Sequence, residues 1–256
     1  MDAKIIVATH KQYQMPSDEL YLPIQVGAEG KEKLNYIGDN TSHNISKKNA
    51  NYCELTGLYW AWKNLNCNYI GLAHYRRHFC LKKKGNKFNS ILTSRELETL
   101  LKNTNVILPK RRNYYIETVY NHYSHTFHCE DLDMTRDIIA EKYPYYIKYF
   151  DKVMQGKKIH IFNMFIMKKE ILNEYCNWLF DILFTLEERL DISKYSSFEA
   201  RVFGRVSELL LDVWLLANDI KFTEIPVIYM EKIDWYRKTT GFLKAKFLGI
   251  KYDKSF

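Results

Sequence analysis

The sequence predicts an α/β fold, built as a single domain around a mostly parallel sheet. Two short apolar runs, Lys4–Thr9 and Asn68–Ala73, have the length and composition of buried strands. Between them, Asn51–Asn64 repeats its apolar residues at helical spacing. Because strand, helix and strand follow in this order, the two strands are expected to pair in parallel. With 46% hydrophobic residues and no low-complexity segment, the 256 residues suffice for one substantial core.

Helix-capping residues and a proline set the expected limits of the helices and strands in the first half of the chain. Asn51 is the expected N-cap of the first helix, with Glu54 at the capping-box position. A short helix is expected over 95–102, and a strand over 105–108 stops at Pro109. The segment that follows is rich in Tyr and His and is expected to form a loop.

The second half alternates helices and strands in the same way. Residues 131–143 have a helical period and acidic residues in the first turn, where they complement the helix dipole. An apolar strand (IHIFNMFIM) is expected over 159–167, and a long helix over 169–189. A further amphipathic helix is expected over 207–217, and a last strand over 221–230.

The chain is basic, with 38 Lys and Arg against 30 Asp and Glu and a formal charge of +8. This charge favours anionic partners such as a nucleoside diphosphate, a phospholipid surface or nucleic acid, without choosing among them. The 5 Cys are widely spaced without a C-x-x-C pair, which indicates reduced thiols. No signal peptide and no run of roughly 18 apolar residues is found, so we expect a cytoplasmic protein.

Polar residues follow the second predicted strand directly, as His74-Tyr75-Arg76-Arg77. In open α/β sheets, ligands bind beyond the carboxyl ends of the strands. Arg76 and Arg77 could there hold a diphosphate and stabilise it as a leaving group. The alternative interpretation is a solvated basic loop.

Two polar residues, His160 and Asn163, interrupt the apolar strand over 159–167. Each needs a hydrogen-bond partner, which could be a substrate hydroxyl, the backbone or water. Gly204 then precedes Glu208, which lies at the expected head of the next helix. The Glu208 carboxylate could lie over the site, or it could only complement the helix dipole.

Seven motifs occur along the chain up to about residue 235: Asp39-Asn40 with NISKKN, NYCELTGLYWAWKN, YIGLAHYRRHF, HYSHTFHCEDLD, FNMFIMKKEI, Trp178-Leu179-Phe180 and FGRVSELLLDVWL. In this order they resemble the capsular and exopolysaccharide glycosyltransferase family long catalogued as a domain of unknown function. The resemblance implies transfer of galactose or galactofuranose from a uridine diphosphate donor to a saccharide acceptor in surface-polysaccharide biosynthesis.

The resemblance also implies a GT-A-like architecture, in which a strand normally ends in an Asp-x-Asp that holds a divalent metal on the diphosphate. The HYRR segment stands at that place here. We expect the guanidinium groups of Arg76 and Arg77 to replace the charge of the metal, so that no metal cofactor is needed. In the alternative, His74 and its neighbours hold Mn²⁺ or Mg²⁺.

A literal Asp-x-Asp does occur, as Asp131-Leu132-Asp133, and three histidines precede it, namely His122, His125 and His128. A transition-metal site is one interpretation, although the spacing matches no zinc pattern. We expect the aspartates to cap a helix instead. The residues expected to contact the acceptor are His125, His128, His160 and Asn163.

The donor is expected along the carboxyl edge of the sheet. The residues expected to bind the nucleotide sugar are Thr9, His10, Lys11, Asp39, Asn40 and His74. If transfer inverts the anomeric centre, a carboxylate must deprotonate the acceptor hydroxyl. Glu208 is the first choice, since its place after the FNMFIM strand parallels that of the base in GT-A-like inverting enzymes. Asp133 and Glu199 are the reserves.

The glycosyltransferase-like domain is expected over 1–235, and a basic aromatic tail over 236–256. Apolar residues at helical spacings beside lysines suit an interfacial helix on an anionic membrane. Because acceptors of this kind grow as lipid-linked oligosaccharides, the resemblance implies a place at the inner face of the plasma membrane. The alternative is that the tail docks on its own domain.

The main competing function is a non-catalytic nucleic-acid-binding module, which the net charge and the interleaved Tyr and Arg would suit. Its basic residues are scattered, however, and 30 acids accompany them, so we expect no nucleic-acid partner. The motifs G-x-x-x-x-G-K-[ST], G-x-G-x-x-G and G-x-S-x-G are all missing. A glycoside hydrolase remains a distant alternative, because the separation of its two acids is spatial.

Overall fold

The computed structural model describes residues 2–83 and 85–231, and the expected tail over 236–256 lies outside them. The strands are β1 (Ala3–Thr9), β2 (Tyr21–Gln25), β3 (Ile37–Gly38), β4 (Tyr69–His74), β5 (Arg77–Phe79), β6 (Val106–Pro109), β7 (Arg112–Asn113), β8 (Lys158–Ile159), β9 (Phe165–Lys168), β10 (Thr223–Ile225) and β11 (Val227–Tyr229). In the described part of the chain, β7 and β8 pair with each other and the other nine strands form one sheet.

The large sheet is mixed but mostly parallel, which confirms the predicted α/β class. Its order is β10-β6-β9-β4-β1-β2-β3, with β5 and β11 attached beside β4. β1 pairs in parallel with both β2 and β4, as the strand–helix–strand order predicts. β9 runs antiparallel between β4 and β6. The carboxyl ends of β1 and β4 therefore lie side by side, with Ala8 opposite His74.

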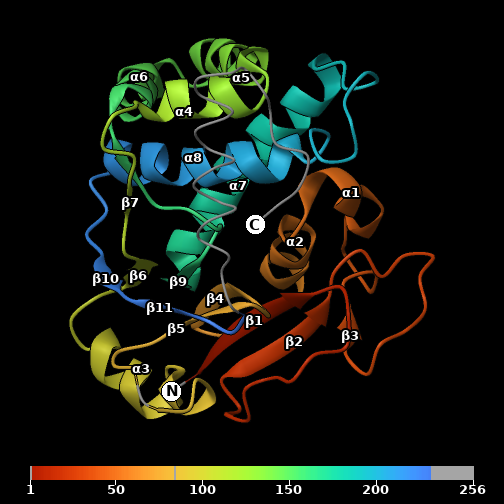
Figure 1. The fold of residues 1–256 in the computed structure, drawn as a ribbon, viewed down its shortest axis with the longest axis vertical. Helices are drawn as coiled ribbons and strands as arrows, with labels where there is room; N and C mark the ends of the chain where they lie inside the picture. The colour runs from red at the N-terminus through yellow and green to blue at the C-terminus, as the bar shows by residue number, and fades with distance from the viewer. Residues whose placement is uncertain (1, 84, 232–256) are drawn as a thin grey trace.

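Helices cover both faces of this sheet (Figure 1). They are α1 (Asn49–Tyr52), α2 (Leu55–Asn64), α3 (Ser94–Leu101), α4 (Val119–Thr126), α5 (Cys129–Lys142), α6 (Ile147–Gln155), α7 (Lys169–Arg189) and α8 (Val202–Ala217). One face packs against α2 and α7, and α3 lies on the other. α8 packs on α7, and α4, α5 and α6 form a layer beyond it.

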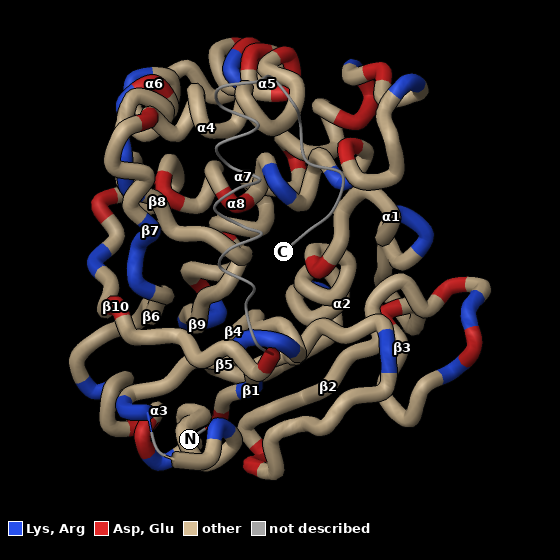
Figure 2. Tube along the Cα trace, in the orientation of Figure 1, with Lys and Arg blue, Asp and Glu red and all other residues tan. Residues whose placement is uncertain are grey.

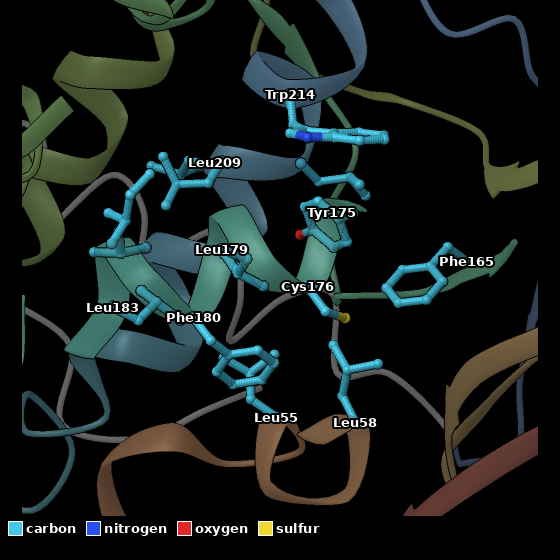
Figure 3. Packing of buried hydrophobic residues seen from close by; sticks show 14 of the residues in the cluster. Leu55, Leu58, Phe165, Tyr175, Cys176, Leu179, Phe180, Leu183, Leu209 and Trp214 are labelled. Carbon is cyan, nitrogen blue, oxygen red and sulfur yellow. The ribbon is translucent and has the colours of Figure 1, made fainter. Parts of the chain in front are cut away.

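The core lies in two clusters, one on each face of the sheet. Side chains of β1 alternate between them, because successive residues of a strand point to opposite faces: Ile6 belongs to the larger cluster and Ile5 to the smaller. Figure 3 shows the larger cluster, in which Phe180 of α7 packs near Leu55 of α2 and Trp214 of α8 near Tyr175. The larger cluster therefore fixes α2, α7 and α8 against the sheet.

The helix expected over 51–64 is wrong in one respect, because it breaks at Cys53. α1 ends before Cys53 and α2 begins after Glu54, and Cys53 has a φ of 53°. Asn51 lies inside α1 and is no N-cap, and Glu54 makes no capping hydrogen bond. Gly204 approaches closely from α8: a Cβ built on it would lie 3.2 Å from Cys53 Sγ. Packing against α8 accommodates the break between α1 and α2, which the local sequence does not predict.

The strand expected over 159–167 is also wrong. β8 ends at Ile159 and β9 begins at Phe165, and the chain turns between them with Phe162 at φ 82° and Asn163 at φ 52°. His160 therefore lies in a connection and not inside a strand, as does Asn163. Positive φ values outside glycine are uncommon and often mark functional sites.

The remaining helices and strands differ less from their predicted limits. α8 begins at Val202, so Glu208 lies in its second turn, and the proposed role in complementing the first-turn dipole is wrong. The strand expected over 221–230 divides into β10 and β11 at Pro226. Part of the expected Tyr- and His-rich loop forms α4, whose N-cap Thr118 accepts from the Asn121 N–H. The sequence did not predict β2, β3, β5, β7 or α6.

Candidate functional site

A cavity of about 280 Å³ opens beyond the carboxyl end of β4, near the usual size range for small-molecule sites. Its walls come from the β4–β5 hairpin, the α1–α2 break, the Ile161–Phe162 turn, α4 and the first turns of α8. Its charged side chains are Glu54, Arg76, Arg77, Arg112, Arg201, Arg205 and Glu208. Three residues of the predicted catalytic set, Arg76, Arg77 and Glu208, therefore meet in one cavity.

The HYRR segment forms the tight hairpin between β4 and β5, in which His74 pairs with Arg77. The His74 ring accepts the Arg76 backbone N–H at Nδ1, at 3.3 Å. The Arg76 side chain has its Nε buried and without a hydrogen-bond partner among the described residues. A buried, unpaired donor on a guanidinium is costly, so its position indicates a ligand that would accept from it. The Arg77 guanidinium stacks on the ring of Phe162, 4.0 Å from the centroid.

His74 lines the cavity as a neutral imidazole. Burial first, and then the neighbouring charges of Arg77 and Arg76, lower the pKa of His74 to about 2. Because Nδ1 accepts a hydrogen bond, the proton of the neutral ring is assigned to Nε2. His74 can therefore donate one hydrogen bond to a ligand.

Three further arginines reach the cavity from elements distant in sequence. Arg205 stacks on Phe127 at 3.9 Å and donates to the backbone carbonyls of Phe198 and Glu199. The Arg201 Nε donates to Cys53 Sγ at 3.1 Å, across the α1–α2 break. Burial raises the pKa of Cys53 to about 11, so this thiol stays protonated. Arg201 and Arg205 were not predicted as site residues, although two arginines four residues apart at the start of one helix share a face.

Two carboxylates, Glu54 and Glu208, lie in the same cavity as these cations. Burial first, and then the negative charge of Glu54, raise the pKa of Glu208 to about 7. A hydrogen bond from the Phe162 backbone and the charges of Arg77 and Arg205 oppose this shift. A carboxyl group with a pKa near neutrality is suited to take and return a proton.

Asn163 lies behind this cavity and not in its lining. Its Nδ2 donates to Glu54 Oε1 and to the Gly204 carbonyl, both at 2.9 Å, and its Oδ1 accepts from Ser207 Oγ at 2.7 Å. Both amide hydrogens are thereby used inside the protein. The structure makes Asn163 a support for the Glu54 carboxylate, where the sequence predicted a contact with the acceptor.

His160 is also placed away from the cavity lining and is 1% exposed. Its two ring nitrogens contact Asp212 Oδ1 and Glu224 Oε1, each at 2.9 Å. Arg111 joins the same group at 3.1 Å from Asp212. This network, which is buried at His160 and Asp212, ties β8 to α8 and β10, so the partners of His160 belong to the protein.

The other predicted acceptor residues pair with carboxylates. The buried Glu117 contacts the Nδ1 atoms of His122 and His125, at 3.3 and 3.1 Å, and only His122 lines the cavity. His128 contacts Glu199 at 3.0 Å. Among the described residues, no group of three His, Cys, Asp or Glu is arranged to hold a metal ion.

The Asp-x-Asp lies inside the first turns of α5, so the prediction that these aspartates cap the helix is wrong: His128 occupies the N-cap position, and its side chain makes no capping hydrogen bond. Asp131 is buried and accepts from the hydroxyls of Tyr123 and Tyr195, each at 2.7 Å. Asp133 accepts from Tyr120 at 2.9 Å. Neither aspartate lines the cavity, and nor does Glu199.

The residues predicted to bind the nucleotide sugar divide into two groups. Thr9 ends β1 beside His74, His10 and Lys11 follow it, and the His10 ring lies 5.5 Å from that of Tyr75. They extend the edge of the sheet on which the cavity opens. Asp39 is buried instead and accepts from the backbone N–H groups of Gly27 and Ala28. It braces a loop, and Asn40 follows it.

Residues 4–219 match the model of a family described as a domain of unknown function, DUF4422. The fold is similar to an apo structure of WbbM, described as a bifunctional glycosyltransferase, with a TM-score of 0.85 and 27% sequence identity. The alignment covers 91% of this chain and 46% of that chain, so the chain spans less than half the length of WbbM. No curated protein matches the sequence. None of the helices over the described ranges has the length and apolar character needed to cross a membrane.

Proposed function

The chain belongs to the DUF4422 family, and from this premise we propose that it is a glycosyltransferase that moves a hexosyl unit from a nucleoside diphosphate sugar to a saccharide acceptor. The similarity to WbbM supports the reaction class. The observation that carries the proposal is the cavity itself, in which five arginines surround two carboxylates. Guanidinium groups match the geometry and charge of a diphosphate.

The proposed step has the acceptor hydroxyl attack the anomeric carbon while the bond from that carbon to the diphosphate oxygen breaks. Glu208 takes the hydroxyl proton, which its raised pKa allows near neutral pH. The bonding electrons leave with the diphosphate, whose charge Arg76 and Arg77 stabilise. Such an in-line displacement inverts the anomeric centre.

The finer features of the proposal rest on the family resemblance. We propose a UDP-sugar donor carrying galactose or galactofuranose, and a lipid-linked oligosaccharide acceptor in capsular or surface-polysaccharide biosynthesis. The reaction would take place in the cytoplasm, at the inner face of the plasma membrane. Aromatic walls such as Tyr114 and Phe127 offer sugar rings apolar faces on which to stack.

Incubation with a panel of nucleotide sugars tests the proposal, with release of nucleoside diphosphate measured with and without saccharide acceptors. Turnover of one UDP-hexose that rises with acceptor is the expected result. A thermal-shift assay separates the nucleic-acid alternative, because a ligand that binds only the folded state raises the melting temperature. Stabilisation by an oligonucleotide and not by any nucleotide sugar would contradict the proposal.

The pH dependence of turnover tests the role of Glu208. The protonated carboxyl cannot accept a proton, so kcat/KM should fall about tenfold per unit as the pH drops below the raised pKa of about 7. In Glu54→Gln the neighbouring negative charge is removed, and the acid limb should move to lower pH. Glu98→Gln, which changes an exposed carboxylate on α3, should leave the profile unchanged. An acid limb at the same pH in Glu54→Gln would contradict this coupling.

Activity should persist in excess EDTA within about twofold, because the arginines supply the charge that a divalent ion would provide. Added Mn²⁺ or Mg²⁺ should raise turnover little. The measurement is nucleoside diphosphate release after dialysis against the chelator. Complete loss that either ion restores would show that a metal acts on the diphosphate.

A further inference from the structure

The loop over 114–118, which joins β7 to α4, presents two large apolar side chains to solvent at the mouth of the cavity. Tyr115 and Ile116 are 74% and 65% exposed, more than any other large apolar residue in the described part of the chain. Tyr114 before them and Val119 after them line the cavity. The exposed pair therefore belongs to the rim of the proposed active site.

This exposure is held by a tight turn and is not the fraying of a loose loop. The Ile116 N–H donates to the Tyr114 carbonyl at 2.6 Å, and Tyr115 between them has a φ of 57°. Three-residue turns with a positive central φ are rare and strained. Both ends of the loop are fixed, because the backbone N–H groups of Tyr114 and Val119 donate to the carbonyls of Lys157 and Gly156, each at 2.8 Å.

The surface next to the turn is positively charged. Lys157 and Lys158 are exposed on the neighbouring strand segment, where Lys158 pairs with Asn113 of β7. Neither lysine forms an ion pair with any described residue. The acid nearest in sequence, Glu117, is buried and directed to His122 and His125. Figure 2 shows the basic residues along β7 and the segment that leads into β8.

We propose that Tyr115, Ile116, Lys157 and Lys158, here named the rim surface, dock the protein on an anionic lipid bilayer. Tyrosine prefers the boundary between hydrocarbon and water, because one end of its side chain is apolar and the other polar. An exposed Ile beside it gains free energy by entering the acyl region, and lysines are attracted to anionic headgroups. Docking in this way turns the mouth of the cavity toward the membrane.

The composition of the rim surface favours a lipid partner over a saccharide. Ile116 offers no hydrogen bond to a sugar hydroxyl, and no exposed carboxylate lies within the loop over 114–118. The consequence for catalysis rests on the proposed function: a lipid-linked acceptor would meet the cavity without leaving the bilayer. The docking itself needs no donor and no turnover.

Vesicle sedimentation of the full chain at low salt tests the proposal, with vesicles of phosphatidylcholine alone or mixed with phosphatidylglycerol. The variants are Tyr115→Asn with Ile116→Ser, and Lys157→Ser with Lys158→Ser; Asn suits the positive φ of the turn. Each lysine near an anionic surface should contribute about fivefold to partitioning, so loss of the lysine pair should lower it about twenty-five-fold. The apolar pair should lower it by about tenfold or more.

Matched controls change residues of the same kinds far along the sheet edge: Ile37→Ser, which is 45% exposed, and Lys31→Ser with Lys33→Ser. These control variants should sediment as the unaltered chain does. All variants should hydrolyse the donor at the same rate as the unaltered chain. Unchanged sedimentation of the rim variants, or no sedimentation of the unaltered chain, would overturn the proposal. So would loss of transfer to a soluble saccharide acceptor with vesicle binding intact, which would identify a saccharide subsite. Lack of donor turnover by the unaltered chain would count against the proposed function alone.

Discussion

Glu208→Gln is expected to lower kcat by about 10²- to 10⁴-fold, the usual contribution of a positioned general base. The substitution keeps the size of the side chain and removes its capacity to take the acceptor proton. Donor affinity should change little, because the neutral amide still fits beside Arg77 and Arg205, whose charges act on Glu208 in the cavity. Steady-state kinetics of transfer and calorimetric titration of the donor together separate the two effects.

The controls for this experiment are the two carboxylates that the sequence holds in reserve as bases. Asp133→Asn removes the charge of the carboxylate that accepts from Tyr120, and Glu199→Gln alters a contact with His128, both outside the cavity. Each should keep kcat within a fewfold of the unaltered protein. If Glu208→Gln turns over normally while one of these variants loses activity, the base lies at that position instead.

Arg77→Ala should reduce turnover by about a hundredfold or more, as does the loss of one transition-state donor in other enzymes. Arg76→Ala should have a similar effect, since its buried Nε has no partner among the described residues and is free to donate to the diphosphate. Arg77→Lys should recover activity only in part, because an ammonium cannot reproduce the planar fork or the stacking on Phe162. Single-turnover rates with saturating donor provide the measurement.

Arg95→Ala is the matched control, because Arg95 is an exposed arginine on α3. It should leave turnover unchanged, which excludes a general effect of lost positive charge. Circular dichroism and thermal melting of each variant report whether the fold persists. Near-normal turnover in both Arg76→Ala and Arg77→Ala would remove the hairpin from the mechanism.

Local sequence predicted the elements whose pattern reflects burial alone. β1 and β4 are short apolar runs, and α7 repeats its apolar residues at helical spacing, so each was placed within one residue of its limits. The arginines of the hairpin could be predicted as well. Polar residues directly after a buried strand must lie at the carboxyl edge of the sheet.

The structure of the connections was decided by tertiary contacts. Cys53 and Phe162 adopt positive φ values that no glycine announces, and both lie against α8: Cys53 packs on Gly204, and the Phe162 backbone bonds to Glu208. Such conformations cost free energy that only the surrounding packing can offset. Periodicity therefore predicted one helix and one strand where the protein has a break and a turn.

What the sequence by itself determined is the α/β class, the parallel pairing of β1 with β4, and the meeting of two arginines at the end of β4. Only the tertiary structure decided which other side chains join them. It placed Glu54, Arg201 and Arg205 in the lining of the cavity. It also placed Asp212 and Glu224 within hydrogen-bond distance of the two ring nitrogens of His160. Periodicity and composition record whether a residue is buried, whereas the partner of a buried polar group depends on elements distant in the chain.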